Sequence, residues 1–171
     1  MIELRNVGKY EFMRIHLIAV LIALSIGLEA QEFTSGKYHT GPDGLMLGGY
    51  DPVSYHQEKP LKGIKSLSHT HDGVTYWFAN AENRELFKDD PEPYIPAFGG
   101  FCAFGLGMVP EKVQGFPPGR YKSSPDAYKL IDGKLYLFYP TNEWPALTMW
   151  NKDEANYLER AKVKWEEIRD H

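Results

Sequence analysis

Apolar and polar residues alternate along two stretches of the chain, and an Asp-Gly pair divides each stretch. The first stretch spans residues 63–79 around Asp72-Gly73, and the second spans residues 127–139 around Asp132-Gly133. Alternation with a period of two is typical of β-strands, and Asp-Gly tolerates the positive φ angles of a two-residue type I′ turn. The pattern therefore predicts two antiparallel β-hairpins.

A helical segment is expected after each hairpin. Asn80 is a residue type that caps helices, and it precedes a helix predicted from Ala81 to about Lys88. A second helical stretch is predicted after Thr141. If the two Asp-Gly pairs are superposed, Phe78 falls on Phe138, which indicates a duplicated hairpin-helix unit. A coincidence between two ordinary Asp-Gly hairpins explains the same pattern equally well.

The C-terminal segment has the clearest helical pattern. Asn151 and Glu154 have the spacing of a capping box, and apolar residues follow on one helical face. This face, which we expect to pack on the sheet, consists of Ala155, Leu158, Ala161, Trp165 and Ile168. Together these elements predict an α+β fold, in which a small antiparallel sheet built from hairpin-helix units packs against the C-terminal helix.

The N-terminal region carries a targeting signal. An apolar run of 12 residues from Leu17 to Leu28 follows Arg14, and it is shorter than the about 20 residues that a membrane-spanning helix needs. We interpret residues 1–30 as an N-terminal extension and signal peptide, residues 31–44 as a flexible lead-in, and residues 45–171 as a single domain. The predicted location is periplasmic or extracellular, without stable membrane insertion after the signal is cleaved.

The composition narrows the range of partners. Lys and Arg number 19, Asp and Glu number 23, and the formal net charge is -4. Because both signs are scattered and no basic stripe is present to neutralise phosphates, nucleic acid is not an expected partner. Cys102 is the sole cysteine, so an intrachain disulfide is excluded.

Cys102, His69 and His71 are the candidate metal ligands. The two histidines are separated by one residue in a predicted strand, so their side chains point to the same face. A thiol and two imidazoles favour soft or borderline ions such as Cu(I) or Zn(II). Two simpler interpretations stay open, because a cysteine between Phe101 and Phe104 is often an inert core residue and a histidine beside a turn is often only solvated.

The loop from Met108 to Ser124 is the candidate contact surface for a protein partner. It contains the apolar residues Phe116, Pro117, Pro118 and Tyr121, and binding residues are disproportionately found on loops. A packed Ω-loop is the alternative. Neither a nucleophile paired with a base nor a pair of carboxylates has a recognisable local signature, so we expect a binding protein and not an enzyme.

Several motifs, taken in order, resemble those of YHS domain-containing proteins. They are Gly49-Tyr50-Asp51-Pro52-Val53-Ser54-Tyr55, Ser68-His69, Tyr76-Trp77-Phe78-Ala79, Ala81-Glu82-Asn83-Arg84 and Gly99-Gly100-Phe101-Cys102-Ala103. The resemblance runs from about Leu45 to about Tyr139. It implies a small α+β module related to treble-clef metal-binding domains, and a connection with heavy-metal handling in exported or transporter-associated proteins.

The sequence departs from the metal-binding relatives at two positions. Ser54 and Ala79 stand where those relatives tend to carry cysteine, and the sequence resembles instead an exported branch that keeps His69 and Cys102 in its motifs. The predicted function is that of an exported YHS-type binding protein, which takes up a Cu or Zn ion for sensing, delivery or sequestration. The alternative is a metal-free ligand- or protein-interaction module with Cys102 in the core.

Overall fold

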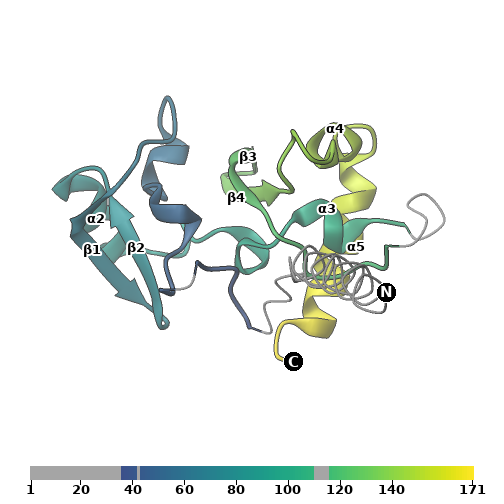
Figure 1. Cartoon of the computed structure of the whole chain (residues 1–171), viewed down its shortest axis with the longest axis horizontal. Helices are drawn as coiled ribbons and strands as arrows, with labels where there is room; N and C mark the ends of the chain where they lie inside the picture. Colours follow the sequence, from purple (N-terminus) through teal and green to yellow (C-terminus); the bar gives the residue numbers. More distant parts are fainter. Residues whose placement is uncertain (1–35, 42, 110–115) are drawn as a thin grey trace, which may run out of the picture. The chain divides into compact units, whose positions relative to one another are not determined.

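The computed structural model describes residues 36–41, 43–109 and 116–171, and these residues form an α+β fold, as the sequence predicts (Figure 1). The described residues form two separate two-stranded antiparallel sheets, where the sequence predicts one small sheet. In the same part of the chain, no helix has the length and apolar character needed to cross a membrane. The predicted signal peptide and residues 31–35 of the predicted lead-in lie outside the described residues.

The first predicted hairpin and its helix are confirmed. Strands β1 (Ile64–His71) and β2 (Val74–Phe78) pair antiparallel, and helix α2 (Ala81–Asp89) lies against both strands (Figure 1). The turn between the strands has positive φ angles of 49° at Asp72 and 77° at Gly73, as a type I′ turn requires. The Asp-Gly pair therefore fixes this hairpin locally.

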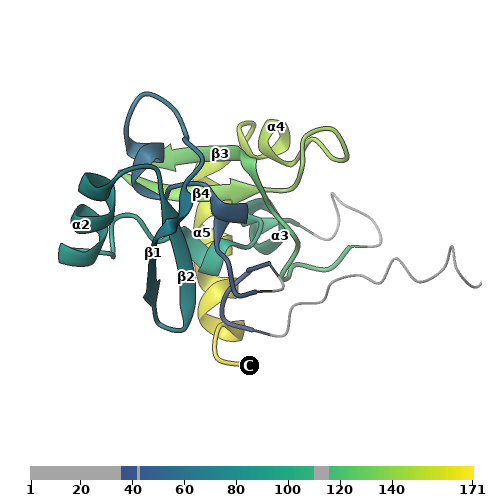
Figure 2. The same cartoon turned by 60° about the vertical axis from the view of Figure 1, so that its left-hand side comes forward.

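The second hairpin repeats the pairing of the first. Strands β3 (Ser124–Ile131) and β4 (Lys134–Phe138) lie side by side and pair antiparallel (Figure 2). Ile64 faces Phe78 in the first hairpin and, 60 positions later, Ser124 faces Phe138 in the second; both registers are then interrupted at the same place. Two hairpins with the same type of turn need not have the same interruption in their strand register. The predicted duplication is therefore confirmed for the hairpins.

One aromatic residue from the following helix packs against the aromatic rings of each hairpin. Phe87 of α2 does so in the first case, and Trp150 of α4 (Ala146–Trp150) does so in the second. The ring pairs are Phe87 with Tyr76 and Phe78, and Trp150 with Tyr136 and Phe138. Seven residues further on, a tyrosine contacts this aromatic residue in each case, Tyr94 on Phe87 and Tyr157 on Trp150. The repeat therefore extends beyond the strands.

A turn of uncommon backbone conformation precedes each hairpin. It lies in the 3-10 helix η1 (Leu47–Gly49) in the first case and in η3 (Ala97–Gly100) in the second. Three consecutive φ angles are 57°, 56° and 81° at residues 47–49, and 56°, 60° and 84° at residues 98–100. Positive φ is uncommon for leucine and phenylalanine, which begin these two triplets. We therefore call residues 46–95 the first module and residues 97–158 the second module.

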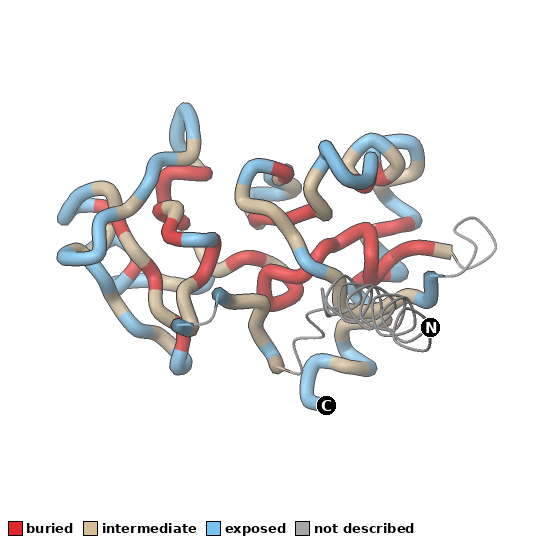
Figure 3. Tube along the Cα trace, viewed as in Figure 1, coloured by how far each residue is buried: buried red, intermediate tan, exposed pale blue. Residues whose placement is uncertain are grey.

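Two hydrophobic clusters form the core, and strand β4 contributes to both. Leu135 and Leu137 pack in the cluster of the first module, whereas Tyr136 and Phe138 pack in the cluster of the second module. Strand β1 is largely exposed, while the last four residues of β4 are buried (Figure 3). Strand β4 thus connects the two clusters.

The predicted C-terminal helix is confirmed as α5 (Glu154–Ile168), but the predicted capping box is wrong. Asn151 lies at the end of α4, and Asp153 takes the N-cap position of α5. Residues 146–150 already form a helix, so Asn151 is not free to start the next one.

Helix α5 shares a hydrophobic cluster with strand β4, in which Tyr157 and Ala161 lie with Tyr136 and Phe138, as predicted for packing on a sheet. Its main contact is the short helix α3 (Ala103–Gly107). The two backbones approach closely at Gly107, where a Cβ atom would lie 2.3 Å from the carbonyl oxygen of Tyr157. A glycine is required at this contact because any side chain would collide with α5.

The folded part of the chain begins before the predicted domain start at Leu45. The amide of His39 donates to the carbonyl oxygen of Gly99 at 2.8 Å, and Thr40 pairs with Met46. Gly99 permits this approach, since a Cβ atom there would lie 2.0 Å from the carbonyl oxygen of Lys37. The described residues of the predicted lead-in are therefore bonded to the domain.

Candidate functional site

Cys102 lies in the cluster of the second module and is only 1% exposed. Its Sγ atom accepts a hydrogen bond from the backbone amide of Tyr139 at 3.2 Å. Burial raises the pKa of the thiol to about 11, although the backbone amides of Gly105, Tyr139 and Phe104 act in the opposite direction. The thiol is therefore protonated at neutral pH and shielded from solvent, which makes it a poor nucleophile.

His69 and His71 share one face of β1, as the sequence predicts. Both rings contact Phe87 edge-on, with ring centroids 6.2 Å and 6.1 Å from that of Phe87. Partial burial lowers the pKa of His69, and the nearby charges of Lys88, His71 and Arg84 lower it further. His69 thus stays neutral at pH 7, which is the form in which an imidazole binds metal ions.

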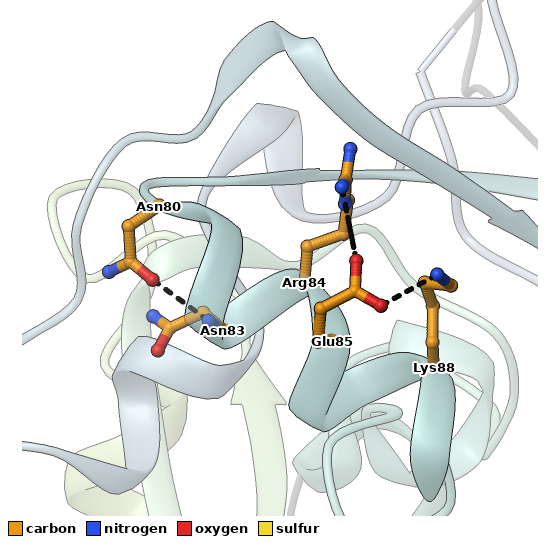
Figure 4. A network of polar contacts seen from close by, with 5 residues as sticks. All are labelled: Asn80, Asn83, Arg84, Glu85 and Lys88. Atoms are coloured by element: carbon orange, nitrogen blue, oxygen red, sulfur yellow. Dashed lines mark hydrogen bonds and ion pairs between the residues drawn. The ribbon is translucent and has the colours of Figure 1, made fainter.

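A charged network on α2, drawn in Figure 4, acts electrostatically on His69. Glu85 accepts hydrogen bonds from Arg84 at 3.1 Å and from Lys88 at 2.7 Å, and these bonds lower its pKa. Figure 4 also shows the helix cap, in which Asn80 Oδ1 accepts from the amide of Asn83 at 2.8 Å. Glu85 is thus paired with two cations on the exposed face of α2.

The structure does not bring the three predicted metal ligands together. Cys102 packs in the cluster of the second module, whereas His69 and His71 contact Phe87, which belongs to the cluster of the first module. Among the residues that the structure describes, no group of three or more His, Cys, Asp or Glu side chains is placed to hold a metal ion. These three residues therefore do not form one three-ligand site.

Asp51 is a buried carboxylate to which the sequence analysis assigns no role. It is 0% exposed, and its oxygens accept hydrogen bonds from the amides of Val53 and Ala79, both at 2.9 Å, and from Asn83 Nδ2 at 2.7 Å. A buried charge is tolerated when it is bonded in this way. An Asp51-Pro52 pair is typical of an ordinary turn, so the burial of Asp51 could not be predicted from the sequence.

Aromatic rings are exposed in the described part of the predicted contact loop and on a segment beside it. Phe116 is 50% exposed and Trp144 is 38% exposed, and their ring centroids are 6.1 Å apart. The ring of Tyr121 lies 6.4 Å from that of Phe116. We call Phe116, Tyr121 and Trp144 the aromatic surface. Residues 110–115 of the loop lie outside the described residues.

Hydrogen bonds hold the C-terminal side of this loop in place. The hydroxyl of Tyr121 donates to the carbonyl oxygen of Pro117 at 2.8 Å, and the amide of Gly119 donates to the carbonyl oxygen of Gly105 at 2.9 Å. Lys122 forms an ion pair with Glu143 at 2.9 Å, which joins the loop to the segment that carries Trp144. The aromatic surface is thus built on an ordered frame.

Comparison with known proteins identifies no relative. No protein-family model matches the chain, and no curated protein and no solved structure shows significant similarity to it.

Proposed function

We propose that this chain is an exported, YHS-type binding protein that contacts a protein partner through the aromatic surface, without a metal ion at Cys102 and without catalytic activity. The exposed rings of Phe116 and Trp144 are the observation that carries the proposal. The ordered motifs between Leu45 and Tyr139 support the YHS assignment, and the apolar run before Ala30 supports export.

The chemistry of the aromatic surface suits a protein partner. Aromatic side chains are enriched in the buried centres of protein interfaces, where they supply a large contact area. The ring planes of Phe116 and Trp144 are tilted by 43°, so the two rings do not cover each other by stacking. The adjacent ion pair of Lys122 and Glu143 supplies a polar edge, as is usual at the rim of an interface.

The aromatic surface lies where the second module departs from the first. The stretch from Gly105 to Tyr121 corresponds to the stretch from Ser54 to Leu61 and is nine residues longer. Phe116 lies in this longer loop. Additions to a repeated scaffold at exposed loops are a common location for binding residues.

The test measures the affinity of the mature protein for a partner captured by cross-linking in the exporting cell and then purified. We expect Phe116→Ser/Trp144→Ser to weaken binding at least tenfold. Leu86→Ser is the matched control, because Leu86 is an exposed apolar residue of the first module, and it should bind like the wild type. Equal affinity of all three proteins would rule out the aromatic surface as the contact.

Metal binding by the histidine pair is a second candidate function. The observation that favours it is the common placement of His69 and His71 against Phe87, with His69 held neutral. Two imidazoles suit Zn(II) or Cu(I), and further ligands would come from water or a partner.

This second candidate predicts a pattern of metal affinities that differs from that of a mixed thiolate-imidazole site. Anaerobic competition against a chromophoric chelator would compare the wild type with His69→Gln, His71→Gln and Cys102→Ala. We expect both histidine variants to lose the ion and Cys102→Ala to keep it. Loss of the ion in Cys102→Ala would instead favour the mixed site, and the absence of uptake by the wild type would remove metal binding altogether.

A further inference from the structure

The two modules share a hydrogen-bonded frame around one buried position. In the first module the amide of Asp51 donates to the carbonyl oxygen of Leu61 at 2.9 Å, and in the second the amide of Cys102 donates to that of Tyr121 at 3.0 Å. Each residue comes two positions after a triplet of positive φ angles. Leu61 and Tyr121 are 60 positions apart, the same separation as the paired residues of the hairpins. Asp51 and Cys102 therefore occupy equivalent places.

The side chains at these two places accept bonds from equivalent backbone amides. Asp51 Oδ2 accepts from the amide of Ala79, and Cys102 Sγ accepts from the amide of Tyr139. Ala79 and Tyr139 each follow the last residue of the second strand of a hairpin. In both modules the buried acceptor therefore ties the preceding turn to the end of a hairpin.

A second group of amides is shared as well. Asp51 Oδ1 accepts from the amides of Val53 at 2.9 Å and Ser54 at 3.4 Å, two and three residues further along the chain. The amides of Phe104 and Gly105, also two and three residues further along, are those that act on the Cys102 thiol. The carboxylate and the thiol thus lie beside equivalent backbone amides, but Cys102 Sγ forms no hydrogen bond with the amides at the start of α3.

The helix residue at the equivalent sequence position differs between the two modules. Asn83 Nδ2 donates to Asp51 Oδ2 at 2.7 Å. Asn83 lies four residues before Phe87, and Ala146 lies four residues before Trp150, where it is fully buried. An ionised carboxylate has about four acceptor sites and needs the extra donor, whereas a thiol is a weak acceptor and does not. An amide next to a thiol would instead be left unsatisfied.

We propose that the duplicated modules share one anchoring position, which two different residue pairs fill. The pair is Asp51 with Asn83 in the first module and Cys102 with Ala146 in the second. Cys102 is then a structural anchor. Its side chain holds the turn of residues 97–101 to the end of β4, and its amide bonds to Tyr121, the residue at which the long loop ends. The inference concerns the frame of the second module and stands whether or not the aromatic surface binds a partner.

The test is a double-mutant cycle on the mature chain, read as the midpoint of thermal unfolding. We expect Cys102→Asp to lower the midpoint strongly, because the new carboxylate lacks an amide partner. We expect Ala146→Asn alone to lower it too, since the buried amide then faces a thiol. The double variant Cys102→Asp/Ala146→Asn should recover at least half of the midpoint lost in Cys102→Asp.

A matched control and a reciprocal cycle keep the test decisive. Cys102→Asp/Ala161→Asn places the amide at another fully buried alanine and should recover nothing. If Cys102→Asp does not fold, recovery of a folded protein by Ala146→Asn supports the pairing. The reciprocal cycle compares Asp51→Cys, Asn83→Ala and Asp51→Cys/Asn83→Ala, and the double variant should be more stable than Asp51→Cys. Additive losses in both cycles would overturn the proposal.

Discussion

At the scale of single residues, the thiol of Cys102 is the clearest case in which surroundings decide chemistry. Burial raises its pKa from the ordinary value of 9.0 to about 11. The pKa of the thiol is thus higher in the folded state than in the unfolded state. The contribution of the protonated thiol to the free energy of unfolding is therefore complete below pH 9 and is lost as the pH rises towards 11.

We therefore expect the free energy of unfolding to fall between pH 9 and pH 11 by up to about 3 kcal/mol more in the wild type than in Cys102→Ala. Urea unfolding of both proteins at several pH values checks this. Burial also raises the pKa values of Tyr55 and Tyr76, but the variant keeps both tyrosines, so the difference isolates the thiol. Parallel pH profiles would show that the thiol is not shielded as described.

The turn glycines are a second case at this scale, because Gly119 has surroundings as open as those of Gly73 and Gly133 but a different backbone conformation. A Cβ atom at Gly73, Gly133 or Gly119 would meet nothing within 4 Å. Gly73 and Gly133 have positive φ angles of 77° and 73°. We expect alanine at either position to cost about 1–2 kcal/mol, and alanine at Gly119 to be neutral or slightly stabilising. Urea unfolding of the three variants measures this, and equal effects at all three sites would count against the type I′ turns.

At the scale of elements, each hairpin depends on the aromatic residue that its helix supplies. Phe87 and Trp150 are both fully buried against strand rings. We expect Phe87→Ala and Trp150→Ala each to cost about 3–5 kcal/mol in the free energy of unfolding, since each leaves a large cavity. Leu86→Ala is the control, because Leu86 is exposed, and it should cost less than about 1 kcal/mol. A small loss at only one of the two aromatic sites would show that the modules are not equivalent in packing.

The elements that could be predicted from sequence are those specified by local chemistry. The Asp-Gly turns and the Asn80 cap act through backbone angles and a nearby amide, so the hairpins and α2 follow from a few adjacent residues. The start of α5 could not be predicted this way, because α4 already includes residues up to Trp150. The shared face of His69 and His71 follows from strand periodicity alone.

At the scale of the whole molecule, prediction failed where distant segments decide the environment. Nothing local shows that Asp51 is buried, since its partners Ala79 and Asn83 are about thirty residues away. The separation of Cys102 from the histidines likewise depends on which cluster each module forms. Yet the matching Gly-Gly-aromatic motifs before Asp51 and Cys102 are visible in the sequence, and they are the signal that points to the repeat.

The two modules are joined by strand β4, and this has a consequence for folding. Leu135 and Leu137 of the second module are buried in the cluster of the first. Without these two fully buried leucines, the first module loses about 3–6 kcal/mol of stabilising free energy from apolar burial. This is a large part of the stability of a domain of about 60 residues.

We therefore expect residues 31–95 alone to lack a cooperative fold, and residues 31–171 to unfold in one transition. Amide NMR dispersion of the shorter fragment and urea unfolding of residues 31–171 check the two statements. Addition of residues 96–171 as a separate fragment should restore dispersed signals, because it returns β4 to the first module. A fragment 31–95 that folds without this addition would show that the first module is an independent domain and that β4 is not required for its core.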